Sequence, residues 1–255
     1  MKIPIIMSAF GTTSKAIATY TRLDKSIRNH FPRTEIIWAY SSKMINRELR
    51  EKKDSTLLRP EEVLTQLATR GITKAVLQSL HLFPGTEFHG LLKIAGKSSL
   101  ECAVGSPLLT SPQDYDQVGE IIRPIISERP DKAIVVIGHG TAHPSWTAYY
   151  SLEKILRKKF GDRIYVGVVE KYPDTAHIVD EIAERGFTEA CIIPFFLVAG
   201  MHYRRDIISD GSSSWLSRLQ NRNIAVESID CGMGLHPGIE DIIIRHITDA
   251  GQTLA

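Results

Sequence analysis

The sequence predicts an α/β protein made of two similar, flavodoxin-like domains, each a parallel sheet flanked by helices. Three observations support this fold class. Short apolar runs alternate with longer amphipathic segments, the runs are apolar on both faces, and the two halves of the chain resemble each other. Strands of a parallel sheet covered by helices on both sides have this continuous apolar character. A chain of 255 residues can form two such domains.

Short segments rich in valine and isoleucine are expected to form the strands. They cover residues 3–10, 35–42, 74–83, 133–140, 163–170, 189–198 and 225–231. Helical patterns lie between them, over residues 14–30, 60–70, 144–160 and 174–185. Pro60 and Pro144 stand where a first helical turn would begin, because proline is tolerated there and disfavours a helical conformation in the residue before it.

An internal repeat is clearest where a helix leads into a strand. Residues 67–85 read LATRGITKAVLQSLHLFPG, and residues 182–200 read IAERGFTEACIIPFFLVAG. Gly71 and Gly186, in the shared frame A-x-R-G-x-T-x-A, fit helix C-termini, where a left-handed residue is favoured. The repeat predicts domains over residues 1–128 and 129–255 that face a central cleft, with the last helix able to pack back on the first half.

Residues that follow the strands are the candidates for a binding site, because ligands of open parallel sheets bind outside the carboxyl ends of the strands. In the register of the repeat, the pairs are Phe10 and His139, Ser42 and Glu170, Glu87 and His202. The second half contributes His, Glu and His, whereas the first contributes Phe, Ser and Glu. The chemistry is therefore expected to lie mainly in the second half, with Glu87 reaching in from the first.

Three of these side chains suit a metal ion. His139 lies in the run GHGTAHP, whose glycines allow a sharp turn and the close approach of a ligand. Glu170 ends a buried strand, where a carboxylate either pairs with a cation or faces a cleft. His202 follows the strand FFLVAG. Imidazole and carboxylate suit cobalt, iron, nickel or zinc, so we predict these three as catalytic residues and metal ligands. His143 is expected either to cap a helix or to support the metal ligands from behind without binding the ion.

Several other kinds of protein are disfavoured by composition. A net charge of +2 without runs of like charge gives no nucleic-acid-binding surface, and no stretch approaches the roughly 20 apolar residues of a membrane span. Three scattered cysteines predict buried free thiols in a reducing cytoplasm. Residues 90–98 and 232–238 miss the spacings of a phosphate-binding loop and a dinucleotide fingerprint. Neither ATP, NAD nor a permanent organic cofactor is expected.

Five motifs together indicate a family. In order, SAFGT, QSLHLFPGTE, GHGTAH, VEKYP and FLVAGMHYRRDI resemble the anaerobic sirohydrochlorin cobalt chelatases of the CbiK type, which have the class II chelatase fold. The resemblance spans nearly the whole chain. It implies a lyase that inserts Co²⁺ into sirohydrochlorin for cobalamin biosynthesis, without ATP. It also implies that His139, Glu170 and His202 bind the metal and that Glu87 tunes metal handling.

The expected mechanism follows from the substrate's chemistry. A tetrapyrrole loses two pyrrole protons while the metal sheds water, and a neutral imidazole can accept a proton and bind the ion. His139 is therefore assigned as the leading base, His202 as the second metal ligand, and Glu170 as the group that offsets the ion's charge and takes up or relays a proton. Residues at the first-half strand ends and in the GHG loop are expected to contact the tetrapyrrole. They are Phe10, Gly11, Thr12, Glu87 and Gly140.

Basic side chains near the predicted site are candidates for binding the substrate's carboxylates. They are Lys171, Arg204 and Arg205. Alternatives stay open at this point. The same ligands would serve an iron chelatase for sirohaem or haem, or nickel as the metal. The chain could also be a non-enzymatic tetrapyrrole or metal carrier, or an α/β binding module without a metal. The sequence leaves homo-oligomer formation open.

Overall fold

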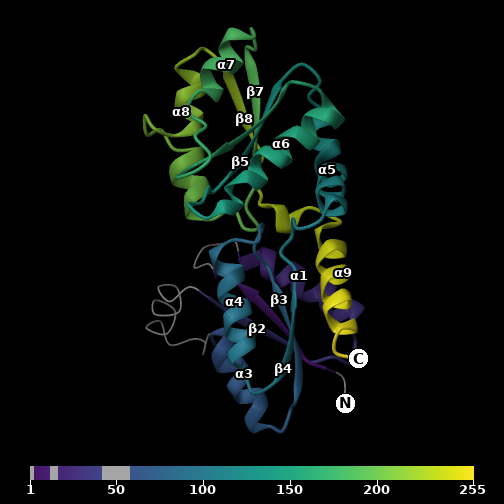
Figure 1. Cartoon of the computed structure of the whole chain (residues 1–255). Helices are drawn as coiled ribbons and strands as arrows, with labels where there is room; N and C mark the ends of the chain where they lie inside the picture. Colours follow the sequence, from purple (N-terminus) through teal and green to yellow (C-terminus); the bar gives the residue numbers. More distant parts are fainter. Residues whose placement is uncertain (1–2, 12–16, 42–57) are drawn as a thin grey trace. The chain divides into compact units, whose positions relative to one another are not determined.

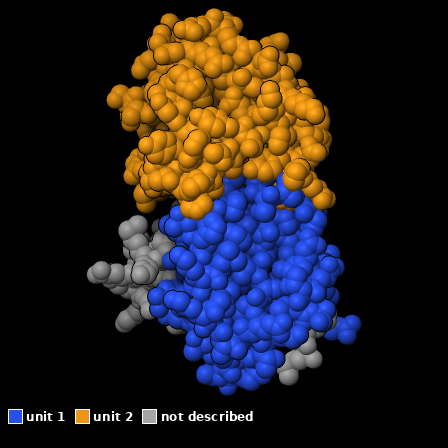
Figure 2. Space-filling view, in the orientation of Figure 1, with its two compact units in different colours: residues 1–111, 240–255 blue, residues 112–239 orange. Residues whose placement is uncertain are grey.

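The computed structural model describes residues 3–11, 17–41 and 58–255 (Figure 1). The chain divides into two compact units (Figure 2). Unit 1 comprises Met1–Ser111 and Glu240–Ala255, and unit 2 comprises Pro112–Ile239. A search of the described residues found no helix with both the length and the apolar character needed to cross a membrane.

Unit 1 forms, within its described residues, a four-stranded parallel sheet in the order β2-β1-β3-β4. Its elements are β1 (Ile5–Ala9), α1 (Ile17–His30), β2 (Ile36–Tyr40), α3 (Pro60–Thr69), β3 (Lys74–Ser79), α4 (Thr86–Lys97), β4 (Glu101–Gly105) and α9 (Ile239–Gln252). The helices bury one apolar face each. In α3, Val63, Leu64 and Leu67 recur at helical spacing and belong to the same core cluster as Ile6 and Leu77 of the sheet.

Unit 2, all of whose residues are described, repeats this arrangement with a four-stranded parallel sheet in the order β6-β5-β7-β8. Its main elements are α5 (Pro112–Ser127), β5 (Ala133–Gly138), α6 (Thr147–Phe160), β6 (Ile164–Val168), α7 (Ile178–Glu184), β7 (Glu189–Pro194), α8 (Trp215–Gln220) and β8 (Ala225–Ser228). Strands β5 and β7 are buried almost throughout because their residues are apolar on both faces.

The equal strand orders confirm the predicted fold class of two similar α/β halves with parallel sheets and flanking helices. Each predicted strand region contains an observed strand. Gly71 and Gly186 follow α3 and α7 with φ of +78° and +79°, as their positions in the repeat predict. Most of the segment 90–98 lies inside α4, so it is helical rather than a phosphate-binding loop.

The compact units differ from the predicted domains 1–128 and 129–255 at α5, which was expected in the first half. The last helix, α9, groups with unit 1, in line with the expectation that it packs back on the first half. Helix α5 belongs to unit 2, where Glu120 accepts a hydrogen bond from Lys159 of α6 over 3.0 Å. Helix α9, yellow in Figure 1, belongs to unit 1. There the carbonyl oxygen of Ser106 lies 3.1 Å from Nδ1 of the buried His246. The helix that follows the last strand of each sheet therefore contributes to the other unit.

The cysteines are all free, as predicted. Cys191 is buried in β7, which matches the expectation of a buried thiol. The expectation is wrong for Cys102 and Cys231, which are partly exposed. Cys102 lies in the edge strand β4, and Cys231 lies in the loop after the edge strand β8, where one side of the backbone is open.

Candidate metal centre

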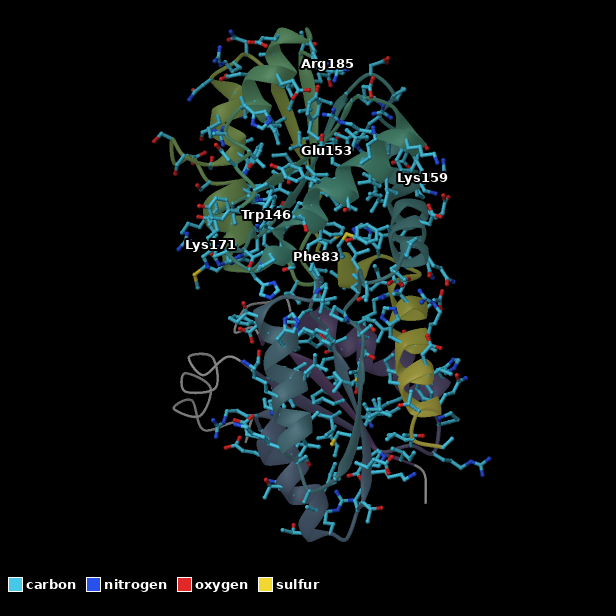
Figure 3. The ribbon with its side chains drawn as sticks, viewed as in Figure 1. Phe83, Trp146, Glu153, Lys159, Lys171 and Arg185 are labelled. Carbon is cyan, nitrogen blue, oxygen red and sulfur yellow. The ribbon has the colours of Figure 1, made fainter. Side chains whose placement is uncertain are left out.

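Three neighbouring strands of unit 2 end next to the predicted metal-binding side chains. His139 directly follows β5, Glu170 comes two residues after β6, and His202 lies in the segment after β7. Because the sheet order is β6-β5-β7, the β5 strand that carries His139 stands between the other two. Figure 3 labels Trp146 and Lys171 from the segments that follow β5 and β6 at this end of the unit.

The two histidines form a close pair. Nε2 of His139 lies 3.2 Å from Nε2 of His202. The ring centroids are 4.4 Å apart and the planes meet at 80°. The side chains are 40% and 37% exposed, so a small ion in water can reach both. Phe196 lies edge-on to His139, with 6.4 Å between the centroids.

Hydrogen bonds at the two Nδ1 atoms determine which nitrogen of each neutral ring carries the proton. Nδ1 of His139 lies 3.0 Å from the carbonyl oxygen of Gly140, and Nδ1 of His202 lies 2.7 Å from Oδ2 of Asp206. Carbonyl and carboxylate oxygens only accept, so each neutral ring carries its proton on Nδ1. Both Nε2 atoms then present lone pairs to each other.

Two facing lone pairs are a favourable site for a cation. Two nitrogens that each lie about 2.0–2.1 Å from a tetrahedral ion are about 3.3 Å apart, close to the 3.2 Å observed here. In the part of the chain that the structure describes, no group of three or more His, Cys, Asp or Glu side chains is placed to hold a metal ion. The two Nε2 atoms converge, and their role as metal ligands stays a prediction; further ligands would come from a rotamer change, from water or from the substrate.

Glu170 contacts the far side of the His139 ring. Its Oε1 lies 3.5 Å from Nδ1 of His139 and 3.0 Å from Nζ of Lys171. Burial raises the pKa of this carboxyl group, but the hydrogen bond from Lys171 and the nearby charges outweigh burial and hold the pKa below its ordinary value. Glu170 is therefore an anion beside the histidine pair. Its role as a third metal ligand stays a prediction.

The loop that carries His139 has little freedom at Gly140. Gly140 has φ of +85°, and a Cβ atom there would lie 1.8 Å from the carbonyl oxygen of Glu170. Its backbone N–H donates to the hydroxyl of the buried Tyr149 over 2.9 Å. His143 caps the short 3-10 helix η1 (Pro144–Trp146) by accepting from the N–H of Ser145, as predicted. The close contact identifies Gly140 as a residue that shapes the site.

Sequence reasoning missed Tyr149 and Asp206. Asp206 lies in the π-helix η2 (Tyr203–Ile207), four residues after His202. The hydrogen bond from Arg205, and to a smaller extent that from His202, hold the pKa of Asp206 below its ordinary value against the effect of burial. The i,i+4 spacing in the run HYRRD was the available signal, because side chains at that spacing meet on one face of a helix.

The residues predicted to contact the tetrapyrrole from the first half lie in unit 1. Phe10 follows β1 with its side chain 52% exposed, and Gly11 has φ of +101°. Glu87 lies in the first turn of α4, after β3. Thr12 and Ser42 lie outside the described residues. The described members are therefore at the carboxyl ends of β1 and β3, and their contacts with substrate stay predictions.

Comparisons with known proteins place the chain in a family. The family model described as cobalt chelatase (CbiK) matches residues 4–252. The sirohydrochlorin cobaltochelatase of Salmonella typhimurium is 28% identical, over 98% of this chain and 97% of that protein. The sirohydrochlorin cobaltochelatase CbiKC of Nitratidesulfovibrio vulgaris is also 28% identical, over 98% of this chain and 91% of that protein.

The fold is shared with solved chelatase structures. SirB from Bacillus subtilis with Fe³⁺ has a TM-score of 0.68 at 14% identity, covering 100% of this chain and 97% of that one. At this identity the similarity concerns the fold alone. The family match spans almost the whole chain, and it includes the GHG loop and the segment that carries His202. The chain therefore belongs to the CbiK family of cobalt chelatases and is a metal chelatase, as its motifs predicted.

Proposed function

We propose that this protein inserts Co²⁺ into sirohydrochlorin without ATP and that the ion is held by His139 and His202. The observation that carries the proposal is the 3.2 Å separation of the two Nε2 atoms, with both Nδ1 atoms engaged elsewhere. The proposal is also supported by the names of both curated relatives, which are sirohydrochlorin cobaltochelatases.

The proposed reaction uses the pair as a temporary metal holder. Imidazole is a ligand that several divalent ions accept, and two ligands leave coordination positions open for pyrrole nitrogens. As nitrogen replaces imidazole around the ion, the released Nε2 of His139 becomes a base that can take one pyrrole proton, and the second passes to water, which reaches the 40% exposed ring. The Glu170 carboxylate, 3.5 Å from Nδ1 of His139, stabilises the imidazolium that results.

The deciding experiment is an anaerobic absorbance assay with sirohydrochlorin and Co²⁺, Fe²⁺ or Ni²⁺. We expect multiple turnovers, fastest with Co²⁺, and loss of turnover in His139→Ala and His202→Ala. Fastest insertion of Fe²⁺ would instead identify an iron chelatase for sirohaem or haem. Tight binding of metal or tetrapyrrole with no turnover would identify a carrier and overturn the proposal.

Arg204 is the best candidate for binding a substrate carboxylate. Lys171 Nζ lies 3.0 Å from Glu170 Oε1, and Arg205 Nε lies 2.7 Å from Asp206 Oδ1. Among the described residues, the exposed Arg204 guanidinium makes no such ion pair. Sirohydrochlorin carries many carboxylates, and a guanidinium binds a carboxylate through two parallel hydrogen bonds.

Replacement of Arg204 by alanine is expected to raise KM for sirohydrochlorin about fivefold, since an exposed charged hydrogen bond contributes about 1 kcal/mol. KM for Co²⁺ should not change. Arg204→Lys should restore part of the affinity by keeping the charge. Arg222→Ala is the matched control, because Arg222 pairs with Asp180 on another part of unit 2. An unchanged KM for sirohydrochlorin would show that Arg204 is only a solvated surface charge.

Exposed apolar side chains beside the histidines suit the flat face of a macrocycle. Tyr172 is 57% exposed and lies two residues after Glu170, and Met201 is 67% exposed and precedes His202. Phe10 and Glu87 stay predicted tetrapyrrole contacts. We place the reaction in the cytoplasm, because three free cysteines are compatible with a reducing compartment.

A further inference from the structure

Asp206 forms a hydrogen bond with Nδ1 of His202, the ring nitrogen that does not face His139. Its Oδ2 accepts from Nδ1 of His202 over 2.7 Å, and its side chain is 24% exposed. Arg205 fixes the carboxylate in turn, with Nε 2.7 Å from Oδ1 and Nη2 3.0 Å from Oδ2. The three groups form a continuous chain from guanidinium to carboxylate to imidazole, and this chain ends at the Nε2 atom that faces His139.

The two histidines are oriented by different means. Nδ1 of His139 is engaged by the carbonyl oxygen of its neighbour Gly140, a backbone group that no substitution removes. Nδ1 of His202 is engaged by a side chain. An imidazole that lost this bond could rotate by half a turn about its last torsion or move its proton to Nε2, because no partner would then hold the proton on Nδ1. After either change, His202 would no longer present an Nε2 lone pair toward His139.

Helix geometry brings the Asp206 carboxylate to the His202 ring. His202 is the N-cap residue of the π-helix η2, and Asp206 lies one turn later in that helix. The buried Tyr203 and Ile207, which flank the same turn, are 3% and 0% exposed and anchor the helix in the core of unit 2. The carboxylate is therefore attached to a fixed part of the unit.

We propose that Asp206 is a positioning residue that fixes the tautomer and orientation of His202 and so sets the affinity of the histidine pair for the metal substrate. The inference rests on the proposed function for its catalytic meaning, but metal binding tests it without turnover. Carboxylates that orient metal-binding histidines typically change metal affinity by about 10–100-fold when removed. Arg205, whose side chain is 62% exposed, is expected to contribute less.

The experiment compares Asp206→Ala, Asp206→Asn and Asp210→Ala with the wild-type protein. Asp210 is the matched control, because it is an exposed aspartate four residues further along the same segment. Co²⁺ is titrated anaerobically into each protein, and the visible absorption bands of the bound ion report affinity and coordination. Steady-state KM for Co²⁺ and for sirohydrochlorin and the thermal midpoint are measured on the same samples.

Asp206→Ala should weaken Co²⁺ binding and raise KM for Co²⁺ by about 10–100-fold, with KM for sirohydrochlorin unchanged. Asp206→Asn keeps an acceptor oxygen and should recover much of the affinity. Wild-type Co²⁺ affinity in Asp206→Ala would overturn the inference, as would an equal loss in Asp210→Ala. So would a fall in thermal midpoint that accounts for the whole effect in both Asp206 variants.

Failure of the positioning role of Asp206 and failure of the proposed function would give different results. If the wild-type protein binds Co²⁺ through both histidines and Asp206→Ala weakens that binding, the positioning role stands even where turnover is absent. If the wild-type protein turns over and His202→Ala stops it while Asp206→Ala binds Co²⁺ normally, only the positioning role is wrong. If Co²⁺ binding does not depend on His202 at all, both proposals are wrong.

Discussion

Replacement of His139 by alanine is expected to lower the rate of cobalt insertion by about 100-fold or more, because it removes a proposed metal ligand and the proposed base together. The protein should stay folded. The side chain is 40% exposed, so its removal leaves no cavity in the core. The anaerobic insertion assay gives the rate, and thermal unfolding checks the fold.

His177→Ala is the control for this experiment, because His177 is an exposed histidine of the same unit that precedes α7. It should insert cobalt at the wild-type rate. Near-normal insertion by a folded His139→Ala protein would rule out the proposed base and ligand. Restoration of activity by added imidazole would support the role of a lone pair at that position.

Among substitutions that add one methyl group near the site, Gly140→Ala is expected to lower stability and cobalt insertion the most. The new Cβ would lie 1.8 Å from the carbonyl oxygen of Glu170, and φ is +85°. The clash must move the loop that carries His139 or the loop that carries Glu170. We expect a loss of about 3 kcal/mol in the free energy of unfolding and a fall of about 6–12 °C in the thermal midpoint. Cobalt insertion should fall at least about tenfold, because a displacement of about 1 Å can cost as much as 100-fold.

Gly161→Ala separates the effect of the positive φ from the effect of the clash. Gly161 has the same φ of +85°, but a Cβ atom there would meet nothing within 4 Å. With ψ of 177° it lies in a region that essentially only glycine adopts, and it has no clash, so we expect about 1–3 kcal/mol of destabilisation and unchanged insertion. Equal effects of the two substitutions on stability and activity would show that the contact between Gly140 and Glu170 does not shape the site.

The residues that could be found from the sequence are those that follow strongly apolar strands. Strands β5 and β6 are apolar on both faces, so the pattern of apolar residues alone locates their ends, and with them His139 and Glu170. His202 lies further from its strand, in the segment after β7. The internal repeat supplied the register. Strand β4, with the sequence ECAVG, was not predicted, because an exposed glutamate and a half-buried cysteine make its apolar pattern weak at the sheet edge.

The supporting residues were harder to predict because their contacts depend on tertiary structure. Tyr149 reaches the N–H of Gly140 from a helix that begins after the GHG loop, and no local pattern marks this hydrogen bond. Asp206 looks like one more charge in the run HYRRD until the helix turns it back toward His202. The grouping of α5 with unit 2 likewise follows from packing, since the sequence of α5 does not show which sheet it covers.

Cobalt binding by the two histidines is tested most directly by an anomalous-scattering map from crystals grown or soaked with Co²⁺. We predict one cobalt peak about 2.1 Å from Nε2 of both His139 and His202, and no such peak in crystals of His202→Ala. A cobalt site elsewhere in the molecule, with no cobalt between the two histidines, would contradict the proposed metal centre.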